Sequence, residues 1–261
     1  MQVAFERDGL PVVELPEELR RLYGGDLRLA ERTLYANFVE TIDGVVAIPS
    51  LERSNALISG HEADRFVMGL LRAVADVVLV GCGTAIASPK GRWKAHTVYP
   101  PAADAFAELR RGLGHEEDAR VAIVTGRGSV DPSHPAVRDG ALIVTTQVGA
   151  DRLGPLIEPP AEIAVVAGDT VVDVRAAIDL LHERGHERIL SEAGPRLFAS
   201  LTRERLVDDL FLTVSPLLAG RGEVEKLGLV EGADLLPDTK LEAHLDSVRI
   251  ADDHLFLRYT L

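Results

Sequence analysis

Short apolar runs alternate with amphipathic segments from about residue 34 to residue 206. The run Asp76–Gly81 is apolar after its first residue, which is typical of a strand covered on both faces of a parallel sheet. The segment before it, 61–75, places Phe66, Leu70, Leu71 and Val74 at helical spacing and is predicted as a helix. The same criteria predict a helix at 174–184 and strands at 34–39, 120–125, 141–145, 161–167 and 188–191. This alternation predicts an α/β domain with a mainly parallel central sheet.

The two ends of the chain depart from this alternation. Residues 1–32 are predicted to form an N-terminal extension with a short helix at 17–23, and residues 33–261 are predicted to form the main domain. Near the C-terminus, the segments 209–214 and 254–261 are strand-like. We expect these two segments to form an antiparallel edge of the sheet.

Two segments inside the main domain have a weaker pattern. The apolar run 45–48 follows the turn Asp43-Gly44 and is predicted to pair with strand 34–39 or to continue it past a bend. Residues 88–104 are rich in the residues that interrupt regular structure, namely Pro89, Gly91, Pro100 and Pro101. This second segment is predicted to be a mobile or variable loop.

The composition is that of a soluble globular protein, with 46% hydrophobic and 26% charged residues. No apolar run approaches the roughly 20 residues that span a bilayer, and the N-terminus shows no signal peptide. Cys82 is the single cysteine, which excludes an intrachain disulfide and a cysteine-rich metal site. We therefore expect a cytoplasmic protein with no membrane partner.

Charge and motifs exclude several classes of function. The formal net charge of −13 opposes nonspecific nucleic-acid binding, which needs cations against phosphates. The eight histidines have no metal-ligand spacing, so we expect no protein-bound metal. The GxSxG, GxxxxGK[ST] and GxGxxG motifs are absent from the sequence. A dinucleotide enzyme of this sequence would have to bind its cofactor at several separate strand ends.

The run 191–222 carries the clearest candidate site. A short apolar strand at 188–191 leads into Gly194 and Pro195, which open a helix with Leu197, Phe198 and Leu201 at helical spacing. A tight strand-glycine-helix turn directs free backbone N–H groups towards whatever lies above the strand end. This geometry favours an anion site such as one for a nucleotide phosphate. An ordinary strand-helix junction remains the alternative.

Three other strand ends have similar glycine turns. Gly81, Gly83 and Thr84 follow one predicted strand, where glycines allow close approach of a ligand and a hydroxyl can bind a phosphate or a carboxamide. Thr125 and Arg127 follow the next strand, and an arginine in that place suits the 2′-phosphate of NADP. Gly168 closes a third strand and could line the nicotinamide side. Simple turns and a solvated surface arginine are the alternatives.

Asp43 is the candidate for binding a heterocycle. It follows the first predicted strand, close to Asn37 and Thr41. A carboxylate beside the mouth of a sheet can accept two parallel N–H bonds from an amino-pyrimidine edge. Because Asp-Gly is a common turn pair, an Asx-turn with Gly44 is the alternative.

Taken in order, these segments resemble the reductase domain of the bacterial riboflavin-biosynthesis deaminase/reductases and its stand-alone relatives, a branch of the dihydrofolate-reductase-like fold. The resemblance covers about residues 33–261 and implies a three-layer αβα architecture. The zinc deaminase half of the bifunctional enzymes has no counterpart in the sequence. The resemblance rests on five segments in the same order, at 36–47, 54–60, 70–84, 122–128 and 189–222.

The resemblance implies NADPH-dependent reduction of a ribosylamino-pyrimidine phosphate, in which the ribosyl group becomes a ribityl chain. The substrate is expected to be 5-amino-6-(5-phosphoribosylamino)uracil or its diaminopyrimidinone equivalent. Asp43 is the expected catalytic residue and would orient the heterocycle, with Asn37, Thr41, Ser59, Gly60 and Arg65 as further substrate residues. The expected NADPH residues are Gly81, Gly83, Thr84, Ser88, Thr125, Arg127, Gly168, Glu192, Ala193, Gly194, Pro195, Arg196 and Leu197. A homodimer is also implied.

The sequence departs from the family pattern in two places. Ser88 replaces an acidic residue that many members have, and the following Pro-Lys-Gly-Arg-Trp run is also unlike theirs. Ala193 replaces the first glycine of a Gly-Gly pair. By the resemblance, the change at Ser88 is adjacent to both ligands and so bears on the substrate. Some stand-alone relatives reduce dihydrofolate instead of the riboflavin precursor. Dihydrofolate reductase activity and a non-catalytic nucleotide- or pterin-binding protein are therefore the alternative functions.

Overall fold

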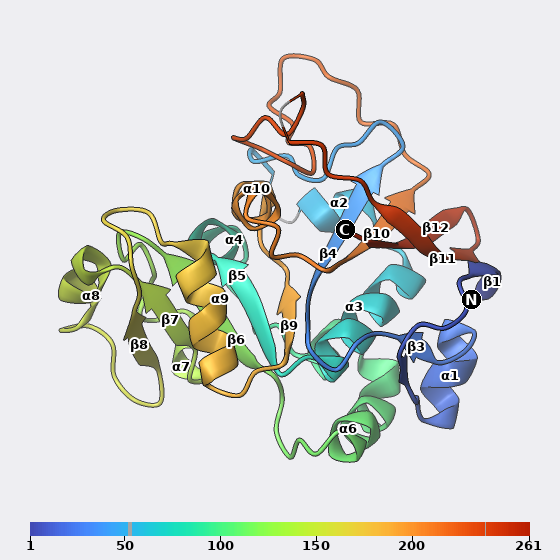
Figure 1. Cartoon of the computed structure of the whole chain (residues 1–261), viewed down its shortest axis with the longest axis horizontal. Helices are drawn as coiled ribbons and strands as arrows, with labels where there is room; N and C mark the ends of the chain where they lie inside the picture. The colour runs from blue at the N-terminus through green and yellow to red at the C-terminus, as the bar shows by residue number, and fades with distance from the viewer. Residues whose placement is uncertain (52–53, 238) are drawn as a thin grey trace.

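The computed structural model describes residues 1–51, 54–237 and 239–261. In this part of the chain, a ten-stranded sheet forms the centre of the molecule (Figure 1). Its strands are, in spatial order, β1 (Gln2–Glu6), β11 (His244–Ala251), β12 (His254–Thr260), β10 (Asp209–Ser215), β4 (Thr33–Thr41), β9 (Arg188–Ser191), β5 (Val77–Gly81), β6 (Arg120–Thr125), β7 (Leu142–Thr145) and β8 (Glu162–Val165).

Strand direction divides the sheet into two parts. All strand pairs from β10 to β8 are parallel, whereas β10, β12, β11 and β1 pair antiparallel. The predicted mainly parallel sheet with an antiparallel C-terminal edge is therefore confirmed. The apolar strand β5 is central, and Val77–Val80 are at most 1% exposed, as expected for a parallel strand with helices on both faces.

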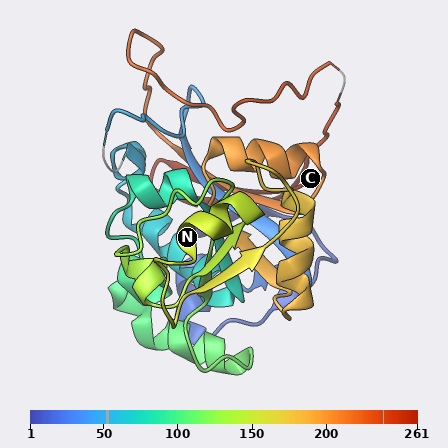
Figure 2. The ribbon, with the colours of Figure 1, turned by 90° about the vertical axis from the view of Figure 1, so that its left-hand side faces the viewer.

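Helices cover both faces of the sheet and produce three layers. One face packs against α1 (Glu17–Tyr23), α3 (Glu62–Val74), α5 (Ala95–Val98), α6 (Ala103–Gly112) and α7 (Pro135–Arg138). The other face packs against α9 (Val174–Glu183) and α10 (Pro195–Arg203). Figure 2 shows α9 and α10 on the side of the sheet opposite to the green helix α6. The predicted three-layer αβα architecture is confirmed.

Short elements complete the described chain. A small sheet pairs β2 (Val12–Val13) with β3 (Leu27–Arg28). The helices α2 (Ser54–Ile58), α4 (Cys82–Ala87) and α8 (Gln147–Leu153) and the 3₁₀ turn η1 (Pro100–Ala102) lie in the connections.

Residues 1–32 pack closely onto the rest of the chain. Strand β1 extends the antiparallel edge, and Leu19 and Tyr23 of α1 are buried in the core on the α3 face. Arg249 of β11 donates to the Tyr23 carbonyl over 3.1 Å, and its guanidinium lies 3.9 Å from the centre of the Tyr23 ring. The boundary at residue 32 between an extension and a main domain stays a prediction.

The prediction for residues 45–48 is wrong. Beyond the turn at Asp43, this segment leaves the sheet, and Ala47 forms an isolated antiparallel bridge with Leu227. The apolar side chains of Val45 and Ile48 are instead buried against Ile58 in a small separate cluster. The apolar side chains of this segment therefore indicate that it is buried, and they do not indicate a strand.

The prediction of a loop at 88–104 is also wrong for much of that segment, whereas its mobility and variability stay predictions. It contains α5 and η1, and α5 packs along α3. Trp93 is 5% exposed and stacks on His134, with 5.9 Å between ring centres. Trp93 reaches this place with a backbone φ of +50°, a left-handed conformation that is uncommon outside glycine. The prolines and the glycine therefore change the direction of the backbone within 88–104, although much of this segment packs against its neighbours.

Candidate active site

The carboxyl ends of four neighbouring parallel strands lie side by side at one edge of the sheet. These strands are β4, β9, β5 and β6, which pair in this order. Such an edge is where open α/β sheets bind their ligands, because the loops after the strands form a crevice there. The long loops that follow β4 and β10 rise above this edge (Figure 1). Most of the site residues predicted from sequence follow these strand ends.

The turn at 192–197 connects β9 to α10 and carries unused hydrogen-bond donors. Gly194 is the N-cap of α10 and Pro195 is its first residue. Within the described chain, the amides of Ala193, Gly194 and Arg196 donate to no other group. A Cβ on Gly194 would lie 3.3 Å from the Thr84 Oγ1, which places that hydroxyl beside the turn. Free amides at a helix N-terminus together with a neighbouring hydroxyl suit a phosphate.

The Glu192 side chain points away from these amides. Its carboxylate accepts two hydrogen bonds from Arg72 of α3, over 2.7 and 2.6 Å, and each of the two side chains is 9% exposed. The Glu192 amide donates to the Leu79 carbonyl of β5 over 3.0 Å. Glu192 therefore anchors the turn to α3 and β5. The backbone amides of the residues that follow it are the groups that face the carboxyl edge of the sheet.

The loop after β5 lies against the same turn. Gly81 is the N-cap of α4, and a Cβ placed there would be 3.6 Å from Leu197. Gly83 is exposed and has open space around it. The predicted cofactor residues at 81–84 and at 192–197 are thus brought together.

The ends of β6 and β8 form the next part of the edge. A Cβ on Gly126 would lie 2.1 Å from the Thr170 carbonyl oxygen, so the loop after β8 packs directly on the loop after β6. Gly168 has a φ of +125°, and a Cβ there would lie 2.0 Å from the Val171 carbonyl oxygen. Both turns need glycine because backbone occupies the position of the side chain.

Thr125 and Arg127 differ in their availability to a ligand. The Thr125 hydroxyl accepts from the Ser129 amide over 2.9 Å and so holds its own loop. Arg127 is exposed, and its side chain has no ion pair or hydrogen bond within the described residues. Arg127 is therefore free to bind an anion at this edge.

Ser88 lies at the far end of α4, as its C-cap residue. Its carbonyl accepts from the Gly91 amide over 2.7 Å and from the His134 Nε2 over 3.0 Å. These contacts hold the segment after α4 against the start of α7, whose N-cap residue is His134. Ser88 therefore stands one short helix away from the turn at 192–197.

The predicted substrate residues surround the end of β4. Asn37 is half-buried, whereas Thr41 and Ser59 are buried. Gly60 is exposed in the turn before α3. Arg65 lies on the outer surface of α3 and is exposed, while its neighbour Asp64 points inward. The structure thus gathers four of these five residues and leaves Arg65 apart.

Asp43 binds its own chain with both carboxylate oxygens. One oxygen accepts from the Thr41 hydroxyl over 2.6 Å and from the Ala219 amide over 3.0 Å. The other oxygen accepts from the Gly220 amide over 2.7 Å. These bonds, led by that of Thr41, lower the pKa of the Asp43 carboxyl from 3.8 to about 2. The carboxylate therefore joins the turn after β4 to the loop after β10.

Replacing Asp43 by alanine is expected to release that loop. Hydrogen bonds to a charged acceptor protect an amide strongly, so exchange of the Ala219 and Gly220 amides should accelerate by at least about tenfold. Hydrogen exchange followed by NMR or mass spectrometry measures this rate. Asp131→Ala is the matched control, because Asp131 also has a pKa lowered by bonds to a neighbouring turn residue, Ser133. Unchanged exchange in Asp43→Ala would contradict the role in the loop.

Sequence reasoning missed Asp64, a buried carboxyl near this edge. Asp64 is 4% exposed, and burial raises its pKa from 3.8 to about 6 despite the nearby Thr213 and Ser59 hydroxyls and His61. Acidic residues are common in the first turn of a helix, where they stabilise its dipole. The signal that could have revealed Asp64 is its helical spacing with Val67, Leu71 and Val74, which are all core residues.

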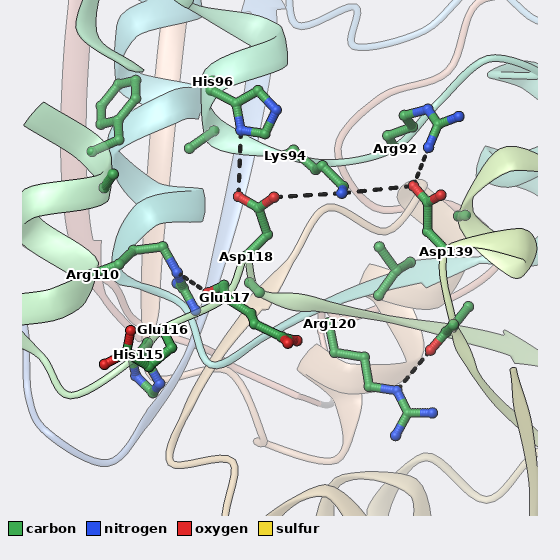
Figure 3. Close-up of a pocket in the computed structure, with 18 of the residues that line it drawn as sticks. Arg92, Lys94, His96, Arg110, His115, Glu116, Glu117, Asp118, Arg120 and Asp139 are labelled. Atoms are coloured by element: carbon green, nitrogen blue, oxygen red, sulfur yellow. Dashed lines mark hydrogen bonds and ion pairs between the residues drawn. The ribbon is translucent and has the colours of Figure 1, made fainter. Parts of the chain in front are cut away.

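A cavity of about 740 Å³ lies at the opposite edge, near the amino ends of β6, β7 and β8 (Figure 3). Its charged groups bind one another. Asp118 lies 3.5 Å from Lys94 and 3.4 Å from His96, and Asp139 pairs with Arg92 and Lys94. Arg110 donates to three backbone carbonyls and Arg120 pairs with Glu162. This mutual neutralisation makes the cavity a weaker candidate than the carboxyl edge.

The described residues lack the features of two other classes of site. None of the described helices has the length and apolar character needed to cross a membrane. The described residues contain no group of three or more His, Cys, Asp or Glu side chains arranged for a metal ion.

Comparison with known proteins gives consistent matches. The family model described as the RibD C-terminal domain matches residues 32–248. A 2,5-diamino-6-ribosylamino-4(3H)-pyrimidinone 5′-phosphate reductase from Archaeoglobus fulgidus is 27% identical over 190 residues, which cover 72% of this chain and 81% of that protein. The reductase of the same name from Methanothermobacter thermautotrophicus is 27% identical over 230 residues, covering 86% and 96%.

A solved structure shares the fold. The pyrimidine reductase-like protein of Corynebacterium diphtheriae superposes with a TM-score of 0.71 at 23% sequence identity. The match covers 93% of this chain and 97% of that one. The similarity therefore extends over most of both chains.

Proposed function

The chain belongs to the RibD C-terminal domain family, and on this premise we propose that it is an NADPH-dependent reductase of a ribosylamino-pyrimidine phosphate. The observation that carries the proposal is the turn at 192–197, where three free amides and the Thr84 hydroxyl meet at the carboxyl edge. Donors of this kind fit the phosphates of a dinucleotide. The reductase names of the two archaeal relatives support the reaction class.

NADPH, when bound, supplies the hydride that reduces C1′ of the ribosyl group to give a ribityl chain. The residues of the chain would bind and orient the two reactants. The amides of Ala193, Gly194 and Arg196 would hold the cofactor phosphates, and Arg127 would hold the 2′-phosphate. The end of β4, with Asn37 and the Ser59-Gly60 turn, would hold the pyrimidine substrate beside the cofactor. Assembly as a homodimer is part of the same proposal.

A turnover experiment tests this function. The purified protein is mixed with NADPH and, in separate reactions, with 2,5-diamino-6-ribosylamino-4(3H)-pyrimidinone 5′-phosphate, with 5-amino-6-(5-phosphoribosylamino)uracil or with dihydrofolate. Loss of the reduced-nicotinamide absorbance with either ribosylamino-pyrimidine supports the proposal. Turnover of dihydrofolate alone would establish the dihydrofolate reductase alternative. Cofactor binding without turnover of any of the three would establish a binding protein.

Replacing Arg127 by alanine is expected to weaken NADPH binding by about 10- to 100-fold, because a charged hydrogen bond to the 2′-phosphate is lost. Binding of NADH should stay within about twofold, since NADH has no phosphate at that position. Fluorescence titration with both cofactors measures the two affinities. Arg203→Ala, at the far end of α10, removes the same charge from an exposed site and serves as the control. Equal losses for both cofactors would show that Arg127 does not bind the 2′-phosphate.

A further inference from the structure

The segment that follows α4 is held by α7 and by the two residues that cap this helix. His134 is the N-cap residue of α7, and its Nε2 lies 3.0 Å from the Ser88 carbonyl oxygen. Asp139 is the C-cap residue and pairs with Arg92 and Lys94 (Figure 3). One short helix therefore binds this segment at both of its ends. The proposed function leaves these contacts without a role.

Both ring nitrogens of His134 form hydrogen bonds. Its Nδ1 accepts from the Ala136 amide over 3.2 Å and thereby caps α7. A carbonyl oxygen can only accept, so Nε2 donates its proton to Ser88. The imidazole is therefore neutral, with its proton on Nε2. His134 is 6% exposed, so water does not readily replace either bond.

Trp93 completes the packing around the bond to Ser88. Its indole stacks on the His134 ring, with 5.9 Å between the ring centres and 29° between the ring planes. A Cβ on Gly91 would lie 2.7 Å from the indole and 3.0 Å from the Ser88 carbonyl oxygen, so the backbone lies directly against both groups. The Gly91 amide donates to the same carbonyl over 2.7 Å. Two hydrogen bonds and close packing therefore fix the Ser88 carbonyl in one position.

Helix α4 has little packing of its own. Ala85 is buried, whereas Gly83, Ile86 and Ala87 are exposed, and Ile86 is 66% exposed. A helix of six residues is too short to be stable without contacts from outside. The position of α4 therefore depends on its two ends. Strand β5 leads directly into its first residue, and the Ser88 amide donates to the Ala85 carbonyl over 3.1 Å at its last turn.

Helix α4 carries Thr84, whose hydroxyl lies beside the turn at 192–197. A Cβ on Gly194 would be 3.3 Å from the Thr84 Oγ1. The next residue, Ala85, accepts from the Ser88 amide, and the Ser88 carbonyl accepts from His134. A short series of contacts therefore joins the His134 ring to a hydroxyl at the carboxyl edge of the sheet.

We propose that His134 is a positioning residue of the cofactor site: its Nε2–H bond to the Ser88 carbonyl fixes the end of α4 and thereby keeps the Thr84 hydroxyl at the turn that carries the free amides. This inference rests on the proposed function. His134 acts through α4 and does not touch the cofactor. Donors bind a phosphate tightly when they are already in place before the ligand arrives. Without the bond, α4 has to be ordered in each binding event, and that ordering lowers the affinity.

Two substitutions separate the two hydrogen bonds of His134. In His134→Asn, the amide oxygen replaces Nδ1 and asparagine is a favoured N-cap residue, but the side chain is too short to reach Ser88. In His134→Gln, the amide nitrogen replaces Nε2 and can donate to Ser88, but glutamine does not cap α7. Both variants lose the ring that stacks on Trp93. The difference between them therefore reports the bond to Ser88.

The two variants should show opposite effects on cofactor binding and on stability. In His134→Asn, NADPH binding should weaken by about five- to tenfold, the effect of losing one neutral hydrogen bond. In His134→Gln, it should stay within about twofold. The midpoint of thermal unfolding should be lower in His134→Gln, because α7 has lost its cap. Fluorescence titration without substrate measures the affinities, and thermal unfolding also checks that both variants are folded.

His61→Asn is the matched control. His61 caps α3 in the same way, because its Nδ1 accepts from the Ala63 amide over 3.1 Å and its Nε2 lies 2.9 Å from an Asp252 carboxylate oxygen. This second bond joins α3 to the β11–β12 turn and not to α4. His61→Asn should therefore leave NADPH affinity within about twofold. An equal loss of NADPH affinity in His61→Asn and His134→Asn would overturn the inference.

Hydrogen exchange without cofactor gives an independent measurement. The Ser88 and Gly91 amides should exchange about five- to tenfold faster in His134→Asn and at nearly the unmodified rate in His134→Gln. Unchanged exchange in His134→Asn, or equal NADPH affinities in the two variants, would overturn the inference. If exchange follows the expected order but the unmodified protein does not bind NADPH, the proposed function is contradicted, while the anchoring of α4 by His134 is supported.

Discussion

Replacement of Arg72 by methionine is expected to lower the free energy of unfolding by about 3–5 kcal/mol, the usual cost of leaving one partner of a buried ion pair alone. Methionine keeps the length and most of the volume of the side chain, so packing is nearly preserved. Glu192 would then be a buried carboxylate without its two hydrogen bonds from Arg72. Urea unfolding measures the change, and a two-state fit gives it directly.

The double variant Arg72→Met with Glu192→Gln separates charge from packing. Glutamine at position 192 carries no charge. Most of the stability lost in Arg72→Met should therefore return in the double variant, because no unpaired charge is buried. If the double variant were no more stable than Arg72→Met, the loss would come from packing instead. The single variant should also weaken NADPH binding, since Glu192 begins the turn that carries the free amides.

Replacement of Gly126 by alanine is expected to have the second-largest effect. The new Cβ would lie 2.1 Å from the Thr170 carbonyl oxygen, so two backbone segments must separate. Overpacking of this kind costs about 3 kcal/mol of stability. Turnover should fall by roughly 100-fold, because a shift of about 1 Å at a reaction site has an effect of that order. Urea unfolding and steady-state kinetics with NADPH measure the two losses.

Gly112→Ala is the control for the glycine substitution. Gly112 ends α6, and a Cβ there would have open space around it. Alanine should stabilise the helix by about 0.5–1 kcal/mol and leave turnover unchanged. A similar result for Gly126→Ala would show that the loops after β6 and β8 move apart freely.

The central sheet was predictable because its strands carry their signal locally. A strand such as β5 is apolar at nearly every position, and a strand buried on both faces has to be. Strand β11 was not predicted, since Asp246 and Arg249 interrupt its apolar pattern. Both side chains are buried, and Arg249 pairs with Glu6, 243 residues away in sequence. Such a pairing leaves no trace in the local pattern.

The site was predictable to the extent that it follows strand ends. Glycine turns after β5, β6 and β9 had to meet, because these strands are parallel neighbours. The partners of the polar side chains were not predictable. Asp43 binds Ala219 and Gly220 across more than 170 residues, and Asp64 is hidden as an ordinary acidic residue of a first helical turn. Only the three-dimensional structure shows which carboxylate already accepts hydrogen bonds from its own chain.

The position of β4 in the sheet has a consequence for synthesis of the protein. Both neighbours of β4, which are β9 and β10, lie in the C-terminal third of the chain. At the usual rate of translation, roughly 10–35 s pass between the appearance of Thr41 and that of its partner Ser215. During this time the nascent chain exposes an apolar strand with two unpaired edges, which is a target for aggregation and for chaperones. The central sheet can therefore be completed only after these two later strands have been synthesised.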